Sequence, residues 1–131
     1  MNRAQAALVL RPPLVIAILV AVARLGGSLA PGVFGSVLAV LFVVSTAGAW
    51  TVLRATGDPG EAVVPIPGRA RIGLEVLIVG GATLGLWILD APVFAVGLAA
   101  LAAVQYGAAI DRVTRLLDLP VGAVPTRDPR A

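Results

Sequence analysis

Four long apolar segments constrain the fold of this chain more than any other feature of its sequence. Two of them carry no charge, and the other two are each interrupted by a single charge, Arg24 in the first and Glu75 in the third. A helix of about 20 mainly apolar residues crosses about 30 Å of hydrocarbon, and none of the segments alternates as a barrel strand does. The sequence therefore predicts an all-α fold, a four-helix transmembrane bundle with antiparallel, up-down-up-down helices. The predicted spans are residues 12–30, 31–53, 72–89 and 91–110.

The overall composition excludes a soluble globular domain. Apolar side chains make up 59% of the 131 residues and charged ones only 13%, whereas soluble domains contain about 25% charged residues. A chain of this length has too small an interior to bury so much apolar surface. We therefore expect the lipid bilayer to cover most of it.

The connections between the predicted spans set the order of the helices in space. Residues 26–32 and 90–92 are short turns, so the spans on either side of each turn form hairpins. The polar segment 55–68 is the longest loop. We expect residues 1–117 to form one transmembrane domain, and the tail 118–131 to be cytoplasmic and disordered.

The arginines indicate how the bundle is oriented. Nine of the ten precede the first span, flank the middle loop or follow the fourth span. They are Arg3, Arg11, Arg54, Arg69, Arg71, Arg112, Arg115, Arg127 and Arg130. The two turns on the opposite side contain one charge, Asp90. The positive-inside rule then predicts a multi-pass protein of an inner (plasma) membrane with both termini in the cytoplasm.

The first span also has features of a secretory signal segment, because small residues precede Pro31. Arg24 lies between the apolar stretch and that cleavage position, and proline is poorly tolerated after a cut. We therefore expect the segment to be retained.

Residue types that are missing from the chain exclude several kinds of chemistry. There is no Cys and no His, and every basic residue is Arg. This excludes disulfides, thiol redox chemistry, Cys/His metal sites and imidazole catalysis. A phosphate-binding loop would need a lysine. We expect no enzyme activity, no cofactor and no metal. Since the arginines lie beside apolar spans, lipid rather than nucleic acid explains the basic charge.

Glu75 is the first candidate functional residue. It lies about one turn into the third span, and a carboxylate in a membrane indicates a functional site when it faces other helices. Polar residues at a similar depth on the second and fourth spans are Ser45, Thr46, Gln105 and Tyr106. Two interpretations stay open. Glu75 belongs to a ligand or proton pathway with these groups, or it forms a structural cluster or a local pair with Arg71.

Arg24 is the second candidate. Helical rise places it about 13 Å from Glu75 along the membrane normal, too far for a direct pair. It either extends toward the outer interface past the neighbouring glycines or lines a cavity that attracts an anionic ligand.

Small residues recur at four-residue spacing on two of the predicted spans, a pattern that lets helices approach closely in lipid. They are Ala95, Ala99, Ala103 and Gly107 on the fourth span and Gly81 and Gly85 on the third. We expect them to pack helices within one bundle or, alternatively, between copies in a homo-oligomer.

From residue 45 onward the chain resembles the YrdB-like family of small four-span bacterial membrane proteins. The similarity consists of Trp50, a proline-containing loop, Arg71 and Glu75 at the start of the third span, and Gly80-Gly81-Ala82 after them. The resemblance implies a four-span topology and draws attention to Glu75, but the family has no assigned activity. Arg24 departs from the pattern, in which an acidic residue is usual in the first span.

Two classes of function follow. The first is a structural or accessory subunit of a larger membrane complex, which should be a closed bundle with an outward-facing stripe of small residues. The second is a small oligomeric transporter or channel-like protein, which should have a water-filled cavity that reaches Glu75 or Arg24.

Overall fold

The computed structural model describes residues 2–55 and 64–118, and most of the predicted tail lies outside the described residues. Helices account for almost all of the described chain, so the all-α prediction is confirmed. The elements in chain order are α1 (Arg3–Ser28), α2 (Gly32–Val52), β1 (Leu53–Ala55), β2 (Val64–Ile66), α3 (Gly68–Ile88), α4 (Pro92–Ala108) and α5 (Ile110–Asp118).

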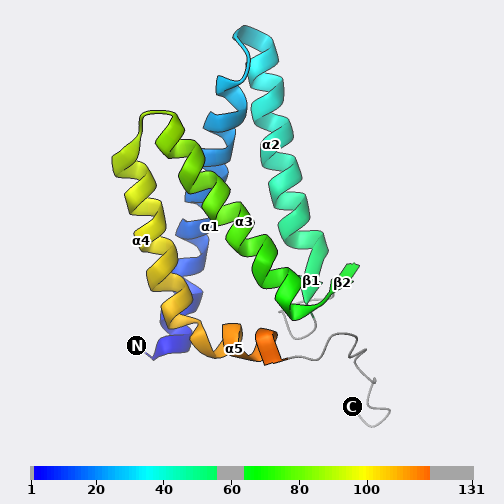
Figure 1. The fold of residues 1–131 in the computed structure, drawn as a ribbon, viewed down its shortest axis with the longest axis vertical. Coiled ribbons are helices and arrows are strands. Elements are labelled where there is room, and N and C mark those ends of the chain that lie inside the picture. Colours follow the sequence, from blue (N-terminus) through cyan, green and yellow to red (C-terminus); the bar gives the residue numbers. More distant parts are fainter. Residues whose placement is uncertain (1, 56–63, 119–131) are drawn as a thin grey trace.

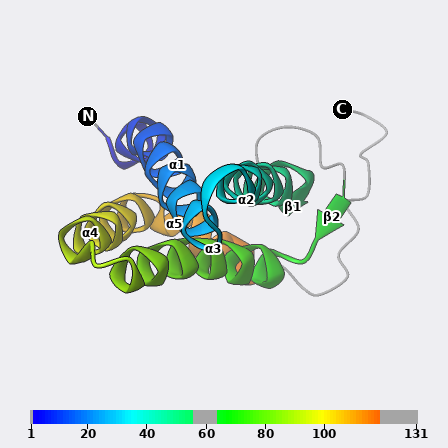
Figure 2. The ribbon, with the colours of Figure 1, turned by 90° about the horizontal axis from the view of Figure 1, so that it is seen from above.

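The four long helices form two hairpins, α1 with α2 and α3 with α4 (Figure 1). Helix α1 contacts α2, α3 and α4, whereas α2 packs mainly against α1. Seen from above, α1, α3 and α4 surround a common space and α2 stands on the far side of α1 (Figure 2). The arrangement is less regular than the predicted four-helix bundle, because α2 contributes little to the shared interior.

The hydrophobic core lies among α1, α3 and α4. Its fully buried members are Leu14, Ile18, Ala21, Val22, Ala82, Leu86, Ala95, Leu98 and Ala102. The α1–α2 hairpin is closed in a different way, by glycine. A Cβ on Gly26 would press on the backbone at Leu38, and a Cβ on Gly35 would collide with the carbonyls of Gly27 and Ala30.

Helix α1 begins at Arg3, well before the predicted first span. The predicted first span begins at Pro12, where a missing N–H would be harmless, but Pro12 and Pro13 both lie inside the helix. A capping box explains the early start. The Asn2 side chain accepts a hydrogen bond from the Gln5 backbone at 2.9 Å, and the Gln5 side chain accepts one from the Asn2 backbone at 3.1 Å.

Helix α5 is the main element that the sequence analysis did not predict. The fourth helix ends at Ala108, and α5 follows at an angle of 72° to it. It lies across the end of the molecule beneath α3 and α4 (Figure 1). Buried Leu116 rests on the start of α3, where a Cβ on Gly68 would collide with the Leu116 carbonyl. Arg69 adds a hydrogen bond from its Nε to the Leu117 carbonyl at 3.3 Å.

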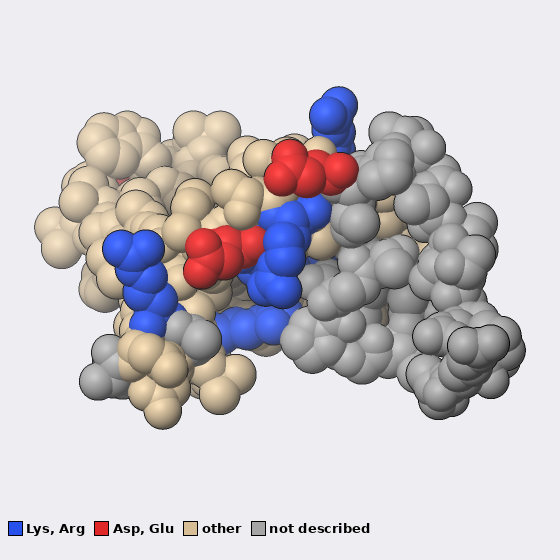
Figure 3. All heavy atoms as spheres, turned by 90° about the horizontal axis from the view of Figure 1, so that it is seen from below, with Lys and Arg blue, Asp and Glu red and all other residues tan. Residues whose placement is uncertain are grey.

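One end of the molecule gathers the starts of α1 and α3, the short parallel pair β1–β2 and α5 (Figure 1). We call it the arginine-rich end, because six of the described arginines lie on the elements there and basic side chains stand out on this face (Figure 3). They are Arg3, Arg11, Arg69, Arg71, Arg112 and Arg115. The opposite end carries Asp90 in the turn between α3 and α4.

Among the described residues, three helices are long and apolar enough to cross a membrane: Gln5–Ser28 of α1, all of α2 and all of α3. Helix α4 has 17 residues, about 25 Å of helix, and reaches the length of a span only together with α5. The long apolar helices are thus compatible with membrane insertion.

Candidate functional site

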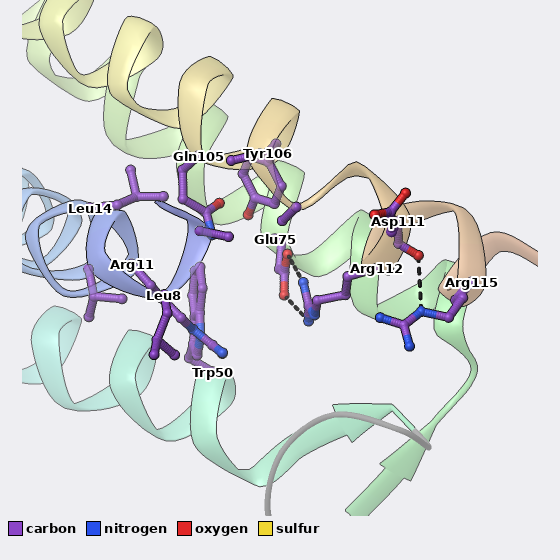
Figure 4. Close-up of a pocket in the computed structure, with 14 residues that line it drawn as sticks. Leu8, Arg11, Leu14, Trp50, Glu75, Gln105, Tyr106, Asp111, Arg112 and Arg115 are labelled. Carbon is purple, nitrogen blue, oxygen red and sulfur yellow. Dashed lines mark hydrogen bonds and ion pairs between the residues drawn. The ribbon is translucent and has the colours of Figure 1, made fainter. Parts of the chain in front are cut away.

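Glu75 lies two turns into α3, and its side chain is only 2% exposed. Arg112 of α5 grips the carboxylate with two hydrogen bonds, from Nη2 to Oε1 at 3.0 Å and from Nη1 to Oε2 at 3.3 Å (Figure 4). Arg71, one turn earlier on α3, places its Nε 3.2 Å from Oε1. Two guanidinium groups therefore compensate one buried carboxylate, which would otherwise be costly to remove from water.

Arg71 connects Glu75 to the end of α2. Its side chain is 1% exposed, and its Nη1 donates to the Trp50 carbonyl at 2.9 Å and to the Leu53 carbonyl. The last carbonyls of a helix have no partner within the helix, so a cation that donates to them is favourable. The guanidinium also lies 5.5 Å from the centre of the Trp50 ring, within cation–π range.

The Tyr106 hydroxyl points toward Glu75 from α4 (Figure 4). With it, one set of side chains links α2, α3, α4 and α5. We call this set the Glu75 network; its members are Trp50, Arg71, Glu75, Tyr106 and Arg112. The Glu75 network is suited to holding the helices together. The Glu75 carboxylate accepts hydrogen bonds from side chains on different elements and so fixes their relative positions.

A cavity of about 230 Å³ adjoins the Glu75 network at the arginine-rich end. Glu75, Gln105 and Tyr106, which the sequence placed at one depth, all line it, and Figure 4 shows them pointing into the same space. Its other charged lining residues are Arg11, Asp111, Arg112 and Arg115. Arginines outnumber acids around this cavity, so its walls favour an anion.

Gln105 is the most unusual of these side chains. It is 7% exposed and has no side-chain hydrogen bond within residues 2–55 and 64–118. Its amide atoms are not fully enclosed by protein and stay accessible from the cavity. Here the amide borders the cavity, where a ligand or water would satisfy it.

Ser45 and Thr46 do not join this group, contrary to the cluster expected from their depth. Ser45 is exposed, and Thr46 lines a separate cavity of about 80 Å³ with Val15, Ile18 and Trp50. The reason is the position of α2. It packs on α1 rather than between α3 and α4, so this part of α2 faces α1.

Arg24 lies in a different part of the fold from Glu75. It is exposed and borders a mainly apolar groove of about 570 Å³ formed by α1, α3 and α4. Within the described chain Arg24 has no ion pair or side-chain hydrogen bond. Glu75 does not border this groove, so the two charges line separate spaces.

The stripes of small residues divide between the core and the surface. Gly85 is buried against Leu25 of α1, and Ala95 belongs to the core. The remaining members, Gly81, Ala99, Ala103 and Gly107, are exposed on the described surface. The buried face of α4 instead passes through Leu98, Ala102 and Gln105. Contact with a second copy through the exposed stripe stays a prediction.

Sequence reasoning missed three arginines of the cavity, Arg11, Arg112 and Arg115. The signal for the last two was present in residues 110–118, where apolar residues at helical spacing alternate with charged ones. Such amphipathic segments lie at the surface of a bilayer rather than across it. Only the angle between α4 and α5, which is a tertiary feature, brings Arg112 onto Glu75.

Long apolar helices joined at one end by a buried ion-pair network are compatible with a small membrane protein. The chain belongs to a family of proteins of unknown function, DUF2568, whose model matches residues 9–103. The match includes Arg71 and Glu75 and ends before Gln105 and α5. No curated protein and no solved structure matches the chain.

Proposed function

We propose that this chain is a structural or accessory subunit of a larger membrane complex in a bacterial inner membrane, a YrdB-like protein without enzymatic activity. Helices α1 to α4 are its four antiparallel spans. Helix α4, with 17 residues, is at the lower end of the length range of membrane helices, and α5, bent away from it by 72°, lies at the membrane surface. The arginine-rich end faces the cytoplasm, because arginines accumulate at the cytoplasmic ends of membrane helices.

The pairing of Glu75 with two arginines is the observation on which this proposal rests. A proton or cation pathway needs a carboxylate that is free to exchange its partner, whereas Glu75 is held between Arg71 and Arg112. The core among α1, α3 and α4 is formed by apolar side chains such as those of Leu14 and Leu86. The cavity at Glu75 and the groove at Arg24 are separate spaces, which argues against one path through a single copy.

The alternative is a small oligomeric transporter or channel-like protein in which Glu75 and Arg24 line the pathway. Proton flux into vesicles separates the two functions. The purified chain, reconstituted in liposomes with a pH-sensitive dye inside, should give no flux above that of protein-free liposomes. Flux that requires the wild-type chain and is lost in a folded Glu75→Gln variant would establish the transporter instead.

Size in the native membrane supplies the second arm of the test. Extracted in mild detergent at its native expression level, a subunit should elute in an assembly larger than the chain itself. Elution as a monomer would refute the subunit role. The orientation in the membrane is tested separately, with introduced cysteines. These are the sole thiols, because the chain has no cysteine of its own. Cysteines replacing Ser28 and Asp90 should react with an impermeant thiol reagent from outside, and one replacing Arg3 should not.

A further inference from the structure

We propose that the cavity beside the Glu75 network binds the phosphate group of an anionic phospholipid from the membrane leaflet at the arginine-rich end. The inference goes beyond the subunit role, because it assigns a ligand to a site that the Glu75 network itself does not need. Three independent features of the cavity support it: its charge, an amide that has no hydrogen-bond partner among the described residues, and the apolar character of one wall.

The charge of the cavity favours a phosphate. Arg11 of α1 has no ion pair or side-chain hydrogen bond among the described residues. Arg115 of α5 uses only its Nε, which donates to the backbone carbonyl of Asp111 at 3.1 Å, so its terminal nitrogens have no partner within the described chain. Glu75 is already compensated by two arginines. Planar guanidinium groups bind phosphate oxygens in pairs, and arginine is suited to this role.

The amide of Gln105 gives the second indication. Its side chain is 93% buried, since 7% is exposed, and it points into the space between α1 and Glu75 (Figure 4). No group within the described residues accepts from its NH₂ or donates to its oxygen. A phosphate oxygen or a glycerol hydroxyl in the cavity would supply the missing partner.

The opposite wall indicates that the phosphate belongs to a lipid. Apolar side chains of α1, among them Leu8, Leu14 and Val15, border the same cavity as the arginines. Leu8 is exposed on the outer surface of α1, so the apolar wall continues to where acyl chains lie. Ligand pockets for drug-sized molecules occupy about 300–1,000 Å³. The roughly 230 Å³ here suits a headgroup alone, with the chains outside.

Basic pockets between membrane helices on the cytoplasmic side are a known mode of anionic lipid binding. Zwitterionic lipids offer the same phosphate but carry a cation beside it, which the arginines would repel. The site should therefore prefer phosphatidylglycerol to phosphatidylcholine.

Trp50 supplies a reporter, because it lines the cavity. The chain's other tryptophan is the exposed Trp87 near the opposite end, and a Trp87→Phe variant leaves Trp50 as the single tryptophan, which can be excited selectively over Tyr106. Brominated phosphatidylglycerol and brominated phosphatidylcholine, titrated into this variant in detergent, should quench Trp50 to different extents. We expect phosphatidylglycerol to bind at least about tenfold more tightly.

Two variants and one control show whether phosphatidylglycerol binds in this cavity. Arg11→Gln and Gln105→Leu should each weaken the binding of phosphatidylglycerol by about tenfold, with unchanged elution profiles showing that the fold is kept. Arg3→Gln removes the same charge from the same helix at a residue that does not line the cavity, and should leave the binding unchanged.

Three results would overturn the proposal. Equal quenching by the two lipids would show that the site does not prefer an anionic lipid. An Arg11→Gln variant that binds like Arg3→Gln would place the lipid elsewhere. Displacement of brominated phosphatidylglycerol by inorganic phosphate or glycerol 3-phosphate, at concentrations equal to that of the lipid, would assign the site to a soluble phosphate.

Discussion

The two charges that interrupt the apolar helices, Glu75 and Arg24, stand in opposite environments. Glu75 is enclosed by side chains of α3, α4 and α5, and two guanidiniums compensate it. Arg24 is exposed beside an apolar groove and has no ion pair within the described chain. A long side chain such as arginine reaches water or headgroups from within a membrane helix, whereas a short carboxylate depends on protein partners. The same sequence signal, one charge in an apolar helix, thus has two structural meanings.

Removing Glu75 should have the largest effect of any single change at the arginine-rich end. Glu75→Ala leaves Arg71 buried without its carboxylate and removes the ion pair between α5 and α3. Losing one partner of a buried pair costs about 3–5 kcal/mol of unfolding free energy. Glu75→Gln keeps the shape of the side chain and should lower the unfolding free energy by less than Glu75→Ala does. Denaturant unfolding in detergent, followed by far-UV circular dichroism, measures both.

Arg24→Leu is the matched control for Glu75→Ala, because it removes the other charge that interrupts an apolar helix. We expect its unfolding free energy to stay within about 0.5 kcal/mol of the wild-type value. If Glu75→Ala were as mild as Arg24→Leu, the Glu75 network would contribute nothing to stability and the contrast between the two charges would fail.

The contact between α5 and α3 gives a second, smaller prediction. Gly68→Ala places a Cβ against the Leu116 carbonyl and should lower the unfolding free energy by about 1–3 kcal/mol. Gly73→Ala, on the same helix with open space around it, should be neutral or stabilising by up to about 1 kcal/mol, because alanine favours a helix.

A double-mutant cycle shows whether this effect passes through the Glu75 network. If Gly68→Ala acts by moving Arg112 away from Glu75, its cost should shrink in an Arg112→Gln background, where that ion pair is already gone. Equal costs in the two backgrounds would mean that the contact between Gly68 and Leu116 and the ion pair between Arg112 and Glu75 are independent.

The sequence predicted those parts of the molecule that depend on local pattern. Hydropathy located the four long helices. The spacing of Arg71 and Glu75 allowed a local pair one turn apart as one of the two open interpretations, and the structure contains that pair. Depth along the helices correctly grouped Gln105 and Tyr106 with Glu75. The position of a residue along its helix does not determine how the helix is rotated or which helices it contacts. Thr46 was therefore grouped with Glu75, although it faces α1.

The rest of the site depends on contacts between distant segments. Arg112 meets Glu75 across 37 positions of sequence because α5 turns 72° away from α4. Neither proline nor a positive φ marks that turn, which follows Ala108 within an apolar run. Arg11 enters the cavity only because α1 extends past two prolines, a continuation that local rules disfavour.

The exposed stripe of α4 gives the prediction with the smallest effect on the single chain. Ala99→Leu and Ala103→Leu add side chains to a face that points away from the core, so the unfolding free energy of a monomer should change by less than about 0.5 kcal/mol. Ala102→Leu is the control on the buried face and should cost about 1–3 kcal/mol. Small residues on a membrane helix favour close contact between helices. If the stripe joins two copies, both exposed variants will keep their stability as monomers but will elute in detergent at a smaller size than the wild type. Unchanged size together with unchanged stability would show that lipid covers the stripe, and would end the case for a homo-oligomer through α4.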